Sequence, residues 1–245
     1  MSNGIKVKKR NGRGTESLNL EKMHKMVEEA TKGIAGVSAS QVEIQSGIQF
    51  YDGITTAEIQ EILIKSASDL IDLDHPNYQF VAARLLLFSI RKSLYGRSRD
   101  MPLLEDHIVT CVNQEVYDAD IYSKYSKEDI EKANGYIDHN RDFLFTYAGL
   151  RQVVDKYLVQ DRSSGGVYET PQFMYMMIAL TIFAEYPKEK RLNYVRRYYD
   201  AISKHKINIP TPIMAGVRTP IRQFASCVLV DSDDTLDSIF SSDMA

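Results

Sequence analysis

The pattern of hydrophobic and polar positions predicts a β-hairpin near the start of the chain. Apolar and basic residues alternate across residues 5–9, Asn11-Gly12 is a strong turn pair, and residues 15–19 return in extended character. Asn19 then caps a helix in which apolar residues recur every three or four positions. Gly33 closes this helix, because glycine accepts the left-handed backbone at a helix C-terminus. The pattern predicts a hairpin followed by one helix.

Three more helices complete the first unit. Ser38 is a second start signal, and Thr55 or Thr56 can cap the next helix. Asp74-His75-Pro76 opens the last helix, because the first turn of a helix tolerates proline, and this helix runs to Tyr95-Gly96. A hairpin and four helices in a little under 100 residues form a compact module of ordinary size.

The next region is predicted to be helical. Residues 97–100 have linker character, and Ser126 is a helix start. A short hairpin is expected across residues 157–169. Residues 173–183 are almost continuously apolar and predict a buried helix, whereas residues 188–204 are amphipathic and predict a half-exposed one.

The pattern changes again after Ile207. Pro210-Thr211-Pro212 cannot lie inside a helix, and we expect a loop through Gly216 to lead into a strand at residues 224–230. Residues 231–238 predict a loop into a helix N-terminus. A strand buried on both faces needs neighbours, and the remaining 15 or so residues do not supply them. We therefore expect the chain to be the front part of something larger.

Composition excludes several classes of protein. With 44% hydrophobic and 26% charged residues in 245, the chain is globular, and its formal charge of −3 excludes a general nucleic-acid binder. No apolar run approaches a membrane span, no apolar segment follows the N-terminal charges, and two cysteines are too few for a disulfide framework. We expect a cytoplasmic protein with no membrane contact. The five histidines are dispersed, so we assign no metal.

Four motifs together resemble the N-terminal third of the large, catalytic subunit of class Ia ribonucleotide reductases, over essentially the whole chain. They are Val7–Gly12, Ile48–Ile54, Ala82–Leu85, and the highly specific Pro210–Pro220 leading to Gln223–Leu229. The resemblance implies an α+β, mostly helical fold. Its expected parts are an N-terminal tail (1–5), an ATP-cone (6–96), a helical domain (97–206) and the truncated start of a ten-stranded α/β barrel (207–245) that another polypeptide completes.

The resemblance further implies that the ATP-cone binds ATP or dATP and sets overall activity. Lys9 and Arg10 can supply charge and donors to a triphosphate, and the helix start after Asn19 offers free N–H groups. Without the family, the basic hairpin would be a solvated edge and Lys92 a cation at a helix end. The implied contacts are Lys9, Arg10, Glu16, Ser17, Leu18, Asn19, Leu20, Glu21, Lys22, Thr56 and Lys92.

Departures from the family concern inhibition. Gln60 and Ser89 stand where some relatives carry histidine, and Arg13-Gly14 contains an extra glycine. We expect nucleotide to bind while dATP inhibition is weak or lost, and full inhibition of the reconstituted enzyme by dATP would contradict this.

The second implied site is the substrate site. Two thiols that end as a disulfide can deliver the two electrons that ribose reduction needs, and Cys227 resembles one of the family's reductant cysteines. Without the resemblance, Cys227 would be interpreted as a small core residue in a strand. Cys111 matches no cysteine motif of the family, and we interpret it as a core residue. Thr211 and Ser226 match substrate contacts. Asp234, Thr235 and Leu236 match the segment that binds the dNTP specificity effector, and the resemblance implies that the nucleotide effectors bind together with Mg²⁺.

The family mechanism also requires a radical-bearing cysteine and a second reductant cysteine that this chain lacks. The resemblance therefore implies a split subunit that is inactive alone. It would reduce ribonucleoside diphosphates only with a C-terminal large-subunit fragment and the small subunit, which carries the radical cofactor. Thioredoxin or glutaredoxin would act through that missing part. Two alternatives remain open: a non-catalytic ATP- or dATP-sensing regulatory module, and a structural helical adaptor.

Overall fold

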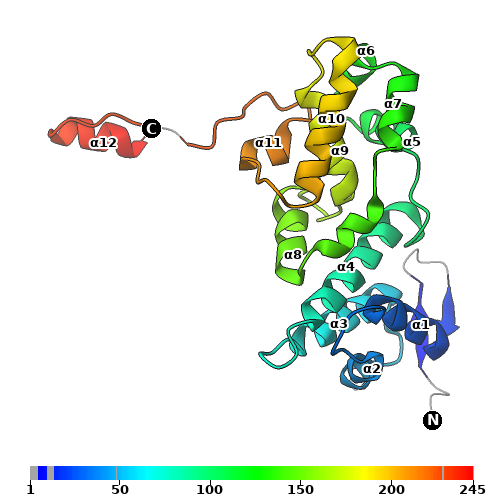
Figure 1. Cartoon of the computed structure of the whole chain (residues 1–245). Coiled ribbons are helices and arrows are strands. Elements are labelled where there is room, and N and C mark those ends of the chain that lie inside the picture. Colours follow the sequence, from blue (N-terminus) through cyan, green and yellow to red (C-terminus); the bar gives the residue numbers. More distant parts are fainter. Residues whose placement is uncertain (1–4, 10–13, 48, 228, 245) are drawn as a thin grey trace.

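The computed structural model describes residues 5–9, 14–47, 49–227 and 229–244. Its N-terminal part is a two-stranded antiparallel hairpin with four helices, as the sequence pattern predicts (Figure 1). The predicted Asn11-Gly12 turn lies outside the described residues. The elements are β1 (Lys6–Lys8), β2 (Thr15–Ser17), α1 (Leu20–Thr31), α2 (Ala39–Gly47), α3 (Thr56–Asp69) and α4 (Tyr78–Tyr95).

The hairpin is held from two sides. Val7 pairs with Glu16 in the β1–β2 register and is buried. Strand β1 also bonds to the turn before α3, because the Lys8 amide donates to the Ile54 carbonyl at 2.9 Å and the Gly53 amide donates to the Lys6 carbonyl at 2.8 Å. These bonds satisfy backbone groups that a two-stranded hairpin would otherwise expose. The strands are therefore held against the start of α3, although each is only three residues long.

Side-chain caps fix where the first helices begin. The Asn19 side chain accepts a hydrogen bond from the Lys22 amide at 2.8 Å, which confirms the predicted cap of α1. Thr55, not Thr56, caps α3, and it forms a capping box with Glu58. The pKa of Glu58 is lowered, chiefly by the hydrogen bond from the Thr55 backbone. Gly96 takes the left-handed conformation (φ 70°) that ends α4.

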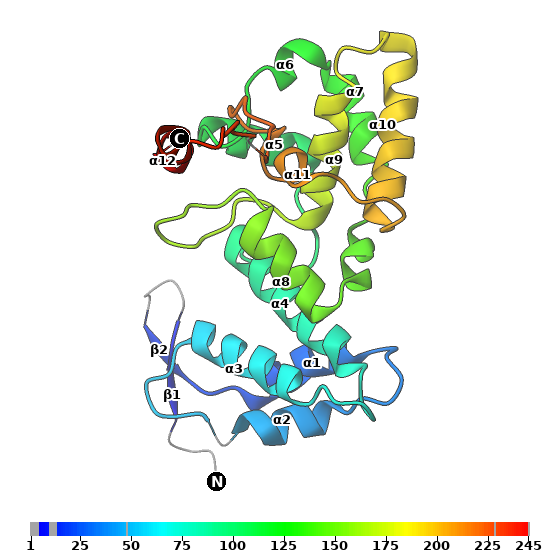
Figure 2. The same ribbon diagram turned by 90° about the vertical axis from the view of Figure 1, so that its left-hand side faces the viewer.

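The remaining elements, except α12, form a second group of helices around α9 (Figure 2). Every residue of α9 from Pro171 to Leu180 is buried, as its apolar run predicts. Helix α4 packs against α3 and also against α8, so it joins the two groups. The elements are α5 (Leu104–Asn113), α6 (Ile121–Lys124), α7 (Lys127–Asn134), the 3-10 helix η1 (His139–Leu144), α8 (Tyr147–Lys156), α9 (Pro171–Ile182), α10 (Lys188–Ser203), α11 (Thr211–Gly216) and α12 (Leu236–Met244).

The structure corrects two predictions in the C-terminal part. The predicted loop through Gly216 is wrong, because Gly216 lies in α11; prolines at positions 210 and 212 flank the start of this helix, where a missing N–H leaves no bond unmade. The strand predicted at residues 224–230 is not formed among the described residues. A strand needs a partner, and this exposed segment has none there. It leads instead to α12, which stands away from the body (Figure 1).

Two smaller predictions are refined. Helix α4 begins at Tyr78, two residues beyond Pro76, because the Asp72 side chain accepts from the amides of Asp74 and His75 and holds them in a turn. The hairpin expected at residues 157–169 is reduced to a single antiparallel bridge between Gln160 and Val167. Within the described ranges, no helix has the length and apolar character that crossing a bilayer requires.

Candidate functional site

A cavity of about 470 Å³ lies between the hairpin, α1, α3, the end of α4 and the segment that follows α4. Its floor is apolar and its rim is polar, a combination typical of small-molecule sites. Val7, Met23, Met26, Ile59 and Phe88 supply the floor. The rim includes most of the nucleotide contacts that the sequence predicts: Glu16, Ser17, Leu18, Asn19, Lys22, Thr56 and Lys92.

The caps described above bring these side chains together. Asn19 and Lys22 lie on the first turn of α1, where the cap bond holds both backbones. Thr56 is the first residue of α3 and reaches the cavity because Thr55 sets the start of that helix. Glu16 lies on β2 opposite Val7. The rim is thus formed by the hairpin, the first turns of α1 and α3, and the last turn of α4.

The cavity is basic although the chain is acidic. Among the described residues, five basic and three acidic side chains line it, which leaves two positive charges, whereas the whole chain carries −3. The basic residues come from three elements or segments, so they surround the opening rather than follow one helix face. They are Lys22, Lys25, Lys92, Arg97 and Arg99. Such an arrangement over an apolar floor suits an anion that carries a flat apolar group.

Three predicted contacts do not line the cavity, and a fourth is not among the described residues. Lys9 does not line the cavity, but its ammonium pairs with Glu16 of the rim at 3.1 Å. Leu20 is exposed, and Glu21 pairs with Lys25 at 2.6 Å on the surface of α1. Arg10 lies outside the described residues. Gln60, noted for its departure from the family, lines the cavity and donates to the Leu85 carbonyl at 3.0 Å.

The sequence did not predict the floor or the two arginines after α4 as parts of a site. Met23, Met26 and Ile59 fit the apolar spacing of their helices and were expected to be core. Arg97 and Arg99 lie in a segment whose composition indicates a linker. These two arginines line the cavity because the backbone after α4 passes back over α1. No periodic pattern in the sequence predicts that backbone path.

Thr211 lines a second cavity, of about 550 Å³, between α8, α10 and α11. The hydroxyl oxygens of Thr211 and Tyr157 lie 3.5 Å apart. His205 and Tyr175 also line it, and burial lowers the pKa of His205. Neither Ser226 nor Cys227 lines this cavity. The structure of this chain therefore separates the predicted substrate contacts.

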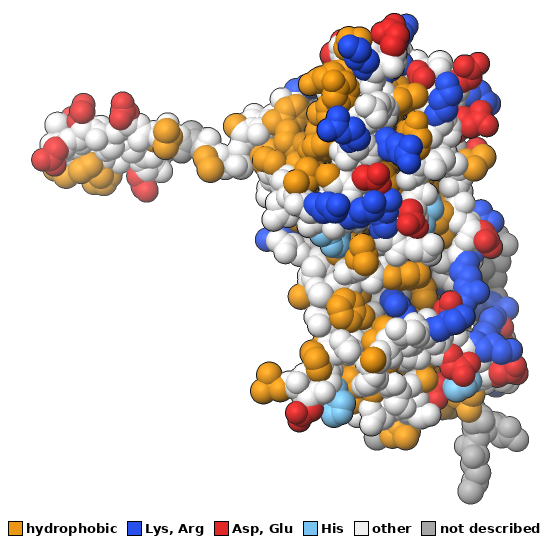
Figure 3. All heavy atoms as spheres, in the orientation of Figure 1, with side chains coloured by type: hydrophobic (Ala, Val, Ile, Leu, Met, Phe, Trp, Pro, Cys, Tyr) orange, Lys and Arg blue, Asp and Glu red, His pale blue; other side chains and the backbone are white. Residues whose placement is uncertain are grey.

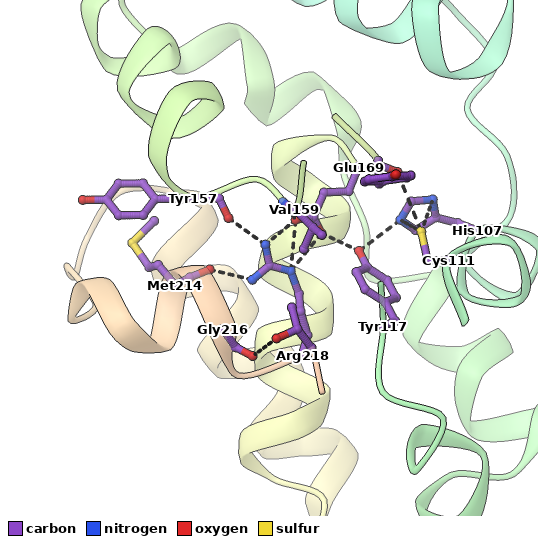
Figure 4. A network of polar contacts seen from close by, with 11 residues as sticks. His107, Cys111, Tyr117, Tyr157, Val159, Glu169, Met214, Gly216 and Arg218 are labelled. Carbon is purple, nitrogen blue, oxygen red and sulfur yellow. Dashed lines mark hydrogen bonds and ion pairs between the residues drawn. The ribbon is translucent and has the colours of Figure 1, made fainter. Parts of the chain in front are cut away.

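A buried ion pair holds α11, and with it Thr211, against the helical body (Figure 4). Arg218 and Glu169 are fully buried, and Arg218 Nε lies 2.9 Å from Glu169 Oε2. The guanidinium also donates to the carbonyls of Tyr157 and Met214, and the Val159 amide donates to Glu169 at 2.7 Å. Burial alone would lower the pKa of Arg218, but the attraction of Glu169 raises it.

The network continues from Glu169 to Cys111 (Figure 4). The Tyr117 hydroxyl donates to Glu169, so the His107 ring nitrogen 3.1 Å from that hydroxyl donates to it. The Cys111 sulfur lies 3.7 Å from His107 Nε2. Burial lowers the pKa of His107 to about 4 and raises that of Cys111 to about 12. Cys111 is thus an inert core thiol, as predicted.

Ser226 and Cys227 lie on the exposed segment between α11 and α12, which with α12 we call the C-terminal arm (residues 221–244). The sulfur of Cys227 is 3.7 Å from the Ser226 hydroxyl oxygen. Asp234, Thr235 and Leu236 mark the start of α12, where the Thr235 hydroxyl accepts from the Ser238 amide at 3.2 Å. All these residues are exposed. Figure 3 shows both acidic and apolar side chains on this projecting part of the chain.

No group of three or more histidine, cysteine, aspartate or glutamate side chains placed to hold a metal ion occurs in the part of the chain that the structure describes. Asp138 caps η1, because its side chain accepts from the Asn140 amide at 3.0 Å. The candidate sites are therefore the two cavities and the arm.

Comparisons with known proteins agree with the two groups of helices. A family model described as ATP cone domain matches residues 5–93, and one described as ribonucleotide reductase, all-alpha domain, matches residues 143–222. The chain is 50% identical over 239 residues to a ribonucleoside-diphosphate reductase subunit alpha of Haemophilus influenzae and 49% identical over 239 residues to ribonucleoside-diphosphate reductase 1 subunit alpha of Escherichia coli.

A phage relative is also similar. The ribonucleoside-diphosphate reductase subunit alpha of enterobacteria phage T4 is 44% identical over 227 residues, which are 92% of this chain and 29% of that protein. The two bacterial alignments cover 98% of this chain and 31% of each relative. The chain thus spans about a third of the length of the curated relatives it matches.

Proposed function

Because the chain belongs to the family of ribonucleoside-diphosphate reductase alpha subunits, whose N-terminal region it spans, we propose that it supplies the effector-sensing part and one reductant thiol of such an enzyme. The first cavity binds ATP or dATP. Residues 6–96 form the ATP-cone, residues 97–206 the helical domain, and residues 207–245 the start of the catalytic barrel. The reaction converts ribonucleoside diphosphates to deoxyribonucleoside diphosphates.

The cavity at the hairpin carries the nucleotide proposal. It gathers Glu16, Asn19, Lys22, Thr56 and Lys92 around an apolar floor, and its surplus of positive charge suits a triphosphate. An apolar floor with neighbouring amide and carboxylate groups suits a purine ring. The Mg²⁺ that accompanies such effectors binds the triphosphate oxygens themselves, so it requires no cluster of protein ligands.

The arm carries the catalytic part of the proposal. The exposed Cys227 donates electrons to the ribose and ends in a disulfide with a second cysteine outside this chain. Thr211 and Ser226 contact the substrate, and Asp234, Thr235 and Leu236 contact the specificity effector. These residues form one site only once further alpha-subunit residues enclose them. The small subunit supplies the radical, and thioredoxin or glutaredoxin regenerates the thiols.

Nucleotide binding by the full chain tests the first half. We expect Lys22→Ala to weaken ATP binding about tenfold, because one charged donor to phosphate is lost, and to reduce its salt dependence. Calorimetric titration measures both. Lys206→Ala is the matched control, since Lys206 is exposed and does not line the cavity. Equal ATP affinity in the wild type and Lys22→Ala would reject this cavity as the nucleotide site.

Reconstitution tests the second half. The chain, mixed with the rest of an alpha subunit and the small subunit, should reduce ribonucleoside diphosphates, and Cys227→Ser should abolish turnover while the complex still assembles. Sustained turnover of Cys227→Ser would refute its redox role. Nucleotide binding without turnover in any such mixture would favour the regulatory module instead.

A further inference from the structure

The segment after α4 crosses the opening of the nucleotide cavity. Gly96 turns the backbone with a φ of 70°, and its amide donates to the Lys92 carbonyl at 3.0 Å. Residues 97–100 all line the cavity. Arg99 then reaches α1, where its guanidinium lies 2.8 Å from Glu29. The segment thus bridges from α4 to α1 before α5 begins at Leu104.

Two features of this bridge favour an exchange of partners. The Arg99–Glu29 pair is exposed, with the arginine side chain 66% and the glutamate side chain 37% accessible, and such pairs contribute little stability. Arg97 also lines the cavity and has no ion-pair partner among the described residues. A triphosphate carries more negative charge than one carboxylate, and guanidinium binds phosphate through two parallel hydrogen bonds.

We propose that Arg97 and Arg99 bind the phosphates of the nucleotide, and that Arg99 leaves Glu29 to do so. This inference rests on the proposed function, because it assigns further ligands to the same cavity. Occupation of the cavity then holds residues 97–100 against the nucleotide. Since the same residues lead into the helical domain, the bound nucleotide fixes the connection between the two groups of helices.

Affinity measurements with single and double variants of the full chain test the exchange. Arg97→Gln and Arg99→Gln should each weaken ATP binding about threefold to tenfold, as expected for partly exposed charged ligands, and should affect AMP less because it carries fewer phosphates. Arg162→Gln, in the exposed loop after Asp161, is the matched control. Both target arginines are exposed, so unfolding curves should match that of the wild type.

Glu29→Gln provides the sharper test. It frees Arg99 and should tighten ATP binding about threefold in the wild-type background, with a clearly smaller gain in the Arg99→Gln background. Equal gains in both backgrounds would show that Glu29 acts only through its general charge, and would overturn the exchange.

Trypsin gives an independent measurement, because it cleaves after arginine. Saturating ATP should slow cleavage after Arg97 and Arg99 about tenfold or more, while cleavage after Arg162 continues unchanged. If the wild type binds ATP and Lys22→Ala does not, but the linker variants bind normally and trypsin cuts the linker equally fast, this inference fails and the proposed function stands. If the wild type binds no ATP, both fail.

Discussion

The proposed nucleotide cavity and the C-terminal arm differ in how their candidate functional side chains are surrounded. Around the cavity, a hairpin, two caps and an αL glycine fix each backbone, and the apolar floor is covered. The arm carries a thiol and an acidic helix start, but α12 buries no residue. The described lining of the cavity comes from residues 7–100, whereas the predicted functional groups of the arm, Cys227 among them, are exposed.

Thiol reactivity should show this difference most strongly. Cys227 is exposed, whereas Cys111 is buried and its pKa is raised to about 12, so very little of it is thiolate at neutral pH. We expect Cys227 to react with a chromogenic disulfide at least about a hundredfold faster. Cys227→Ser should remove the fast phase, and denaturant should make both thiols fast. Two equally fast phases in the native protein would mean that the arm is no more open than the core.

Breaking the buried ion pair should have the next largest effect. Glu169→Gln leaves Arg218 charged and buried without its counter-ion, and we expect the free energy of unfolding to fall by about 3–5 kcal/mol. Arg222→Gln is the control, because Arg222 is 61% exposed in its pair with Asp118, and it should cost less than about 1 kcal/mol. Urea unfolding measures both. Similar losses would place the two ion pairs in equivalent surroundings.

The pH dependence of stability should follow the buried histidine of the same network. Unfolded His107 takes up a proton below about pH 6.5, but the folded ring does so only near pH 4. The unfolded state therefore binds more protons in this window, so the free energy of unfolding falls as the pH falls, by up to about 1.4 kcal/mol per pH unit for this group. His107→Gln should flatten the curve between pH 6.5 and 4, and an unchanged slope would contradict the shift.

Removing a threonine cap should have the smallest effect on the free energy of unfolding. Thr55→Ala removes the capping box of α3 and should reduce the free energy of unfolding by about 1 kcal/mol. Thr235→Ala removes the cap bond of α12, which buries nothing, so the global transition should not change measurably. A comparable loss from Thr235→Ala would show that α12 packs on the body.

The sequence predicted the elements whose signals are local. Asn19, Thr55, Ser126 and Gly96 begin or end helices in the structure as their chemistry requires. The strand expected at residues 224–230 is not formed among the described residues, because apolar content indicates burial but supplies no strand partner. The helix at Gly216 was missed because its prolines were taken only as breakers, although they suit a first turn.

The site was predicted in part for the same reason. Contacts on the first turn of α1 follow a recognisable motif, and the structure brings Asn19 and Lys22 to the cavity. The pairing of Glu169 with Arg218 joins residues 49 positions apart, and neither helical period nor charge spacing encodes it. The sequence likewise did not predict that Arg97 and Arg99 line the cavity, because their position depends on the path of the backbone after α4.

Helix α4 is one continuous rod of 18 residues, about 27 Å long, that begins among the ATP-cone helices and also packs on α8. A stiff rod magnifies a small tilt: a rotation of about 5° at one end displaces the other by about 2 Å. Phe88 and Lys92, which line the cavity, lie beside Arg91 on this rod, and Arg91 donates to Asp142 of η1 at 2.8 Å, so a tilt of α4 at the cavity moves its contact with the second group of helices as well.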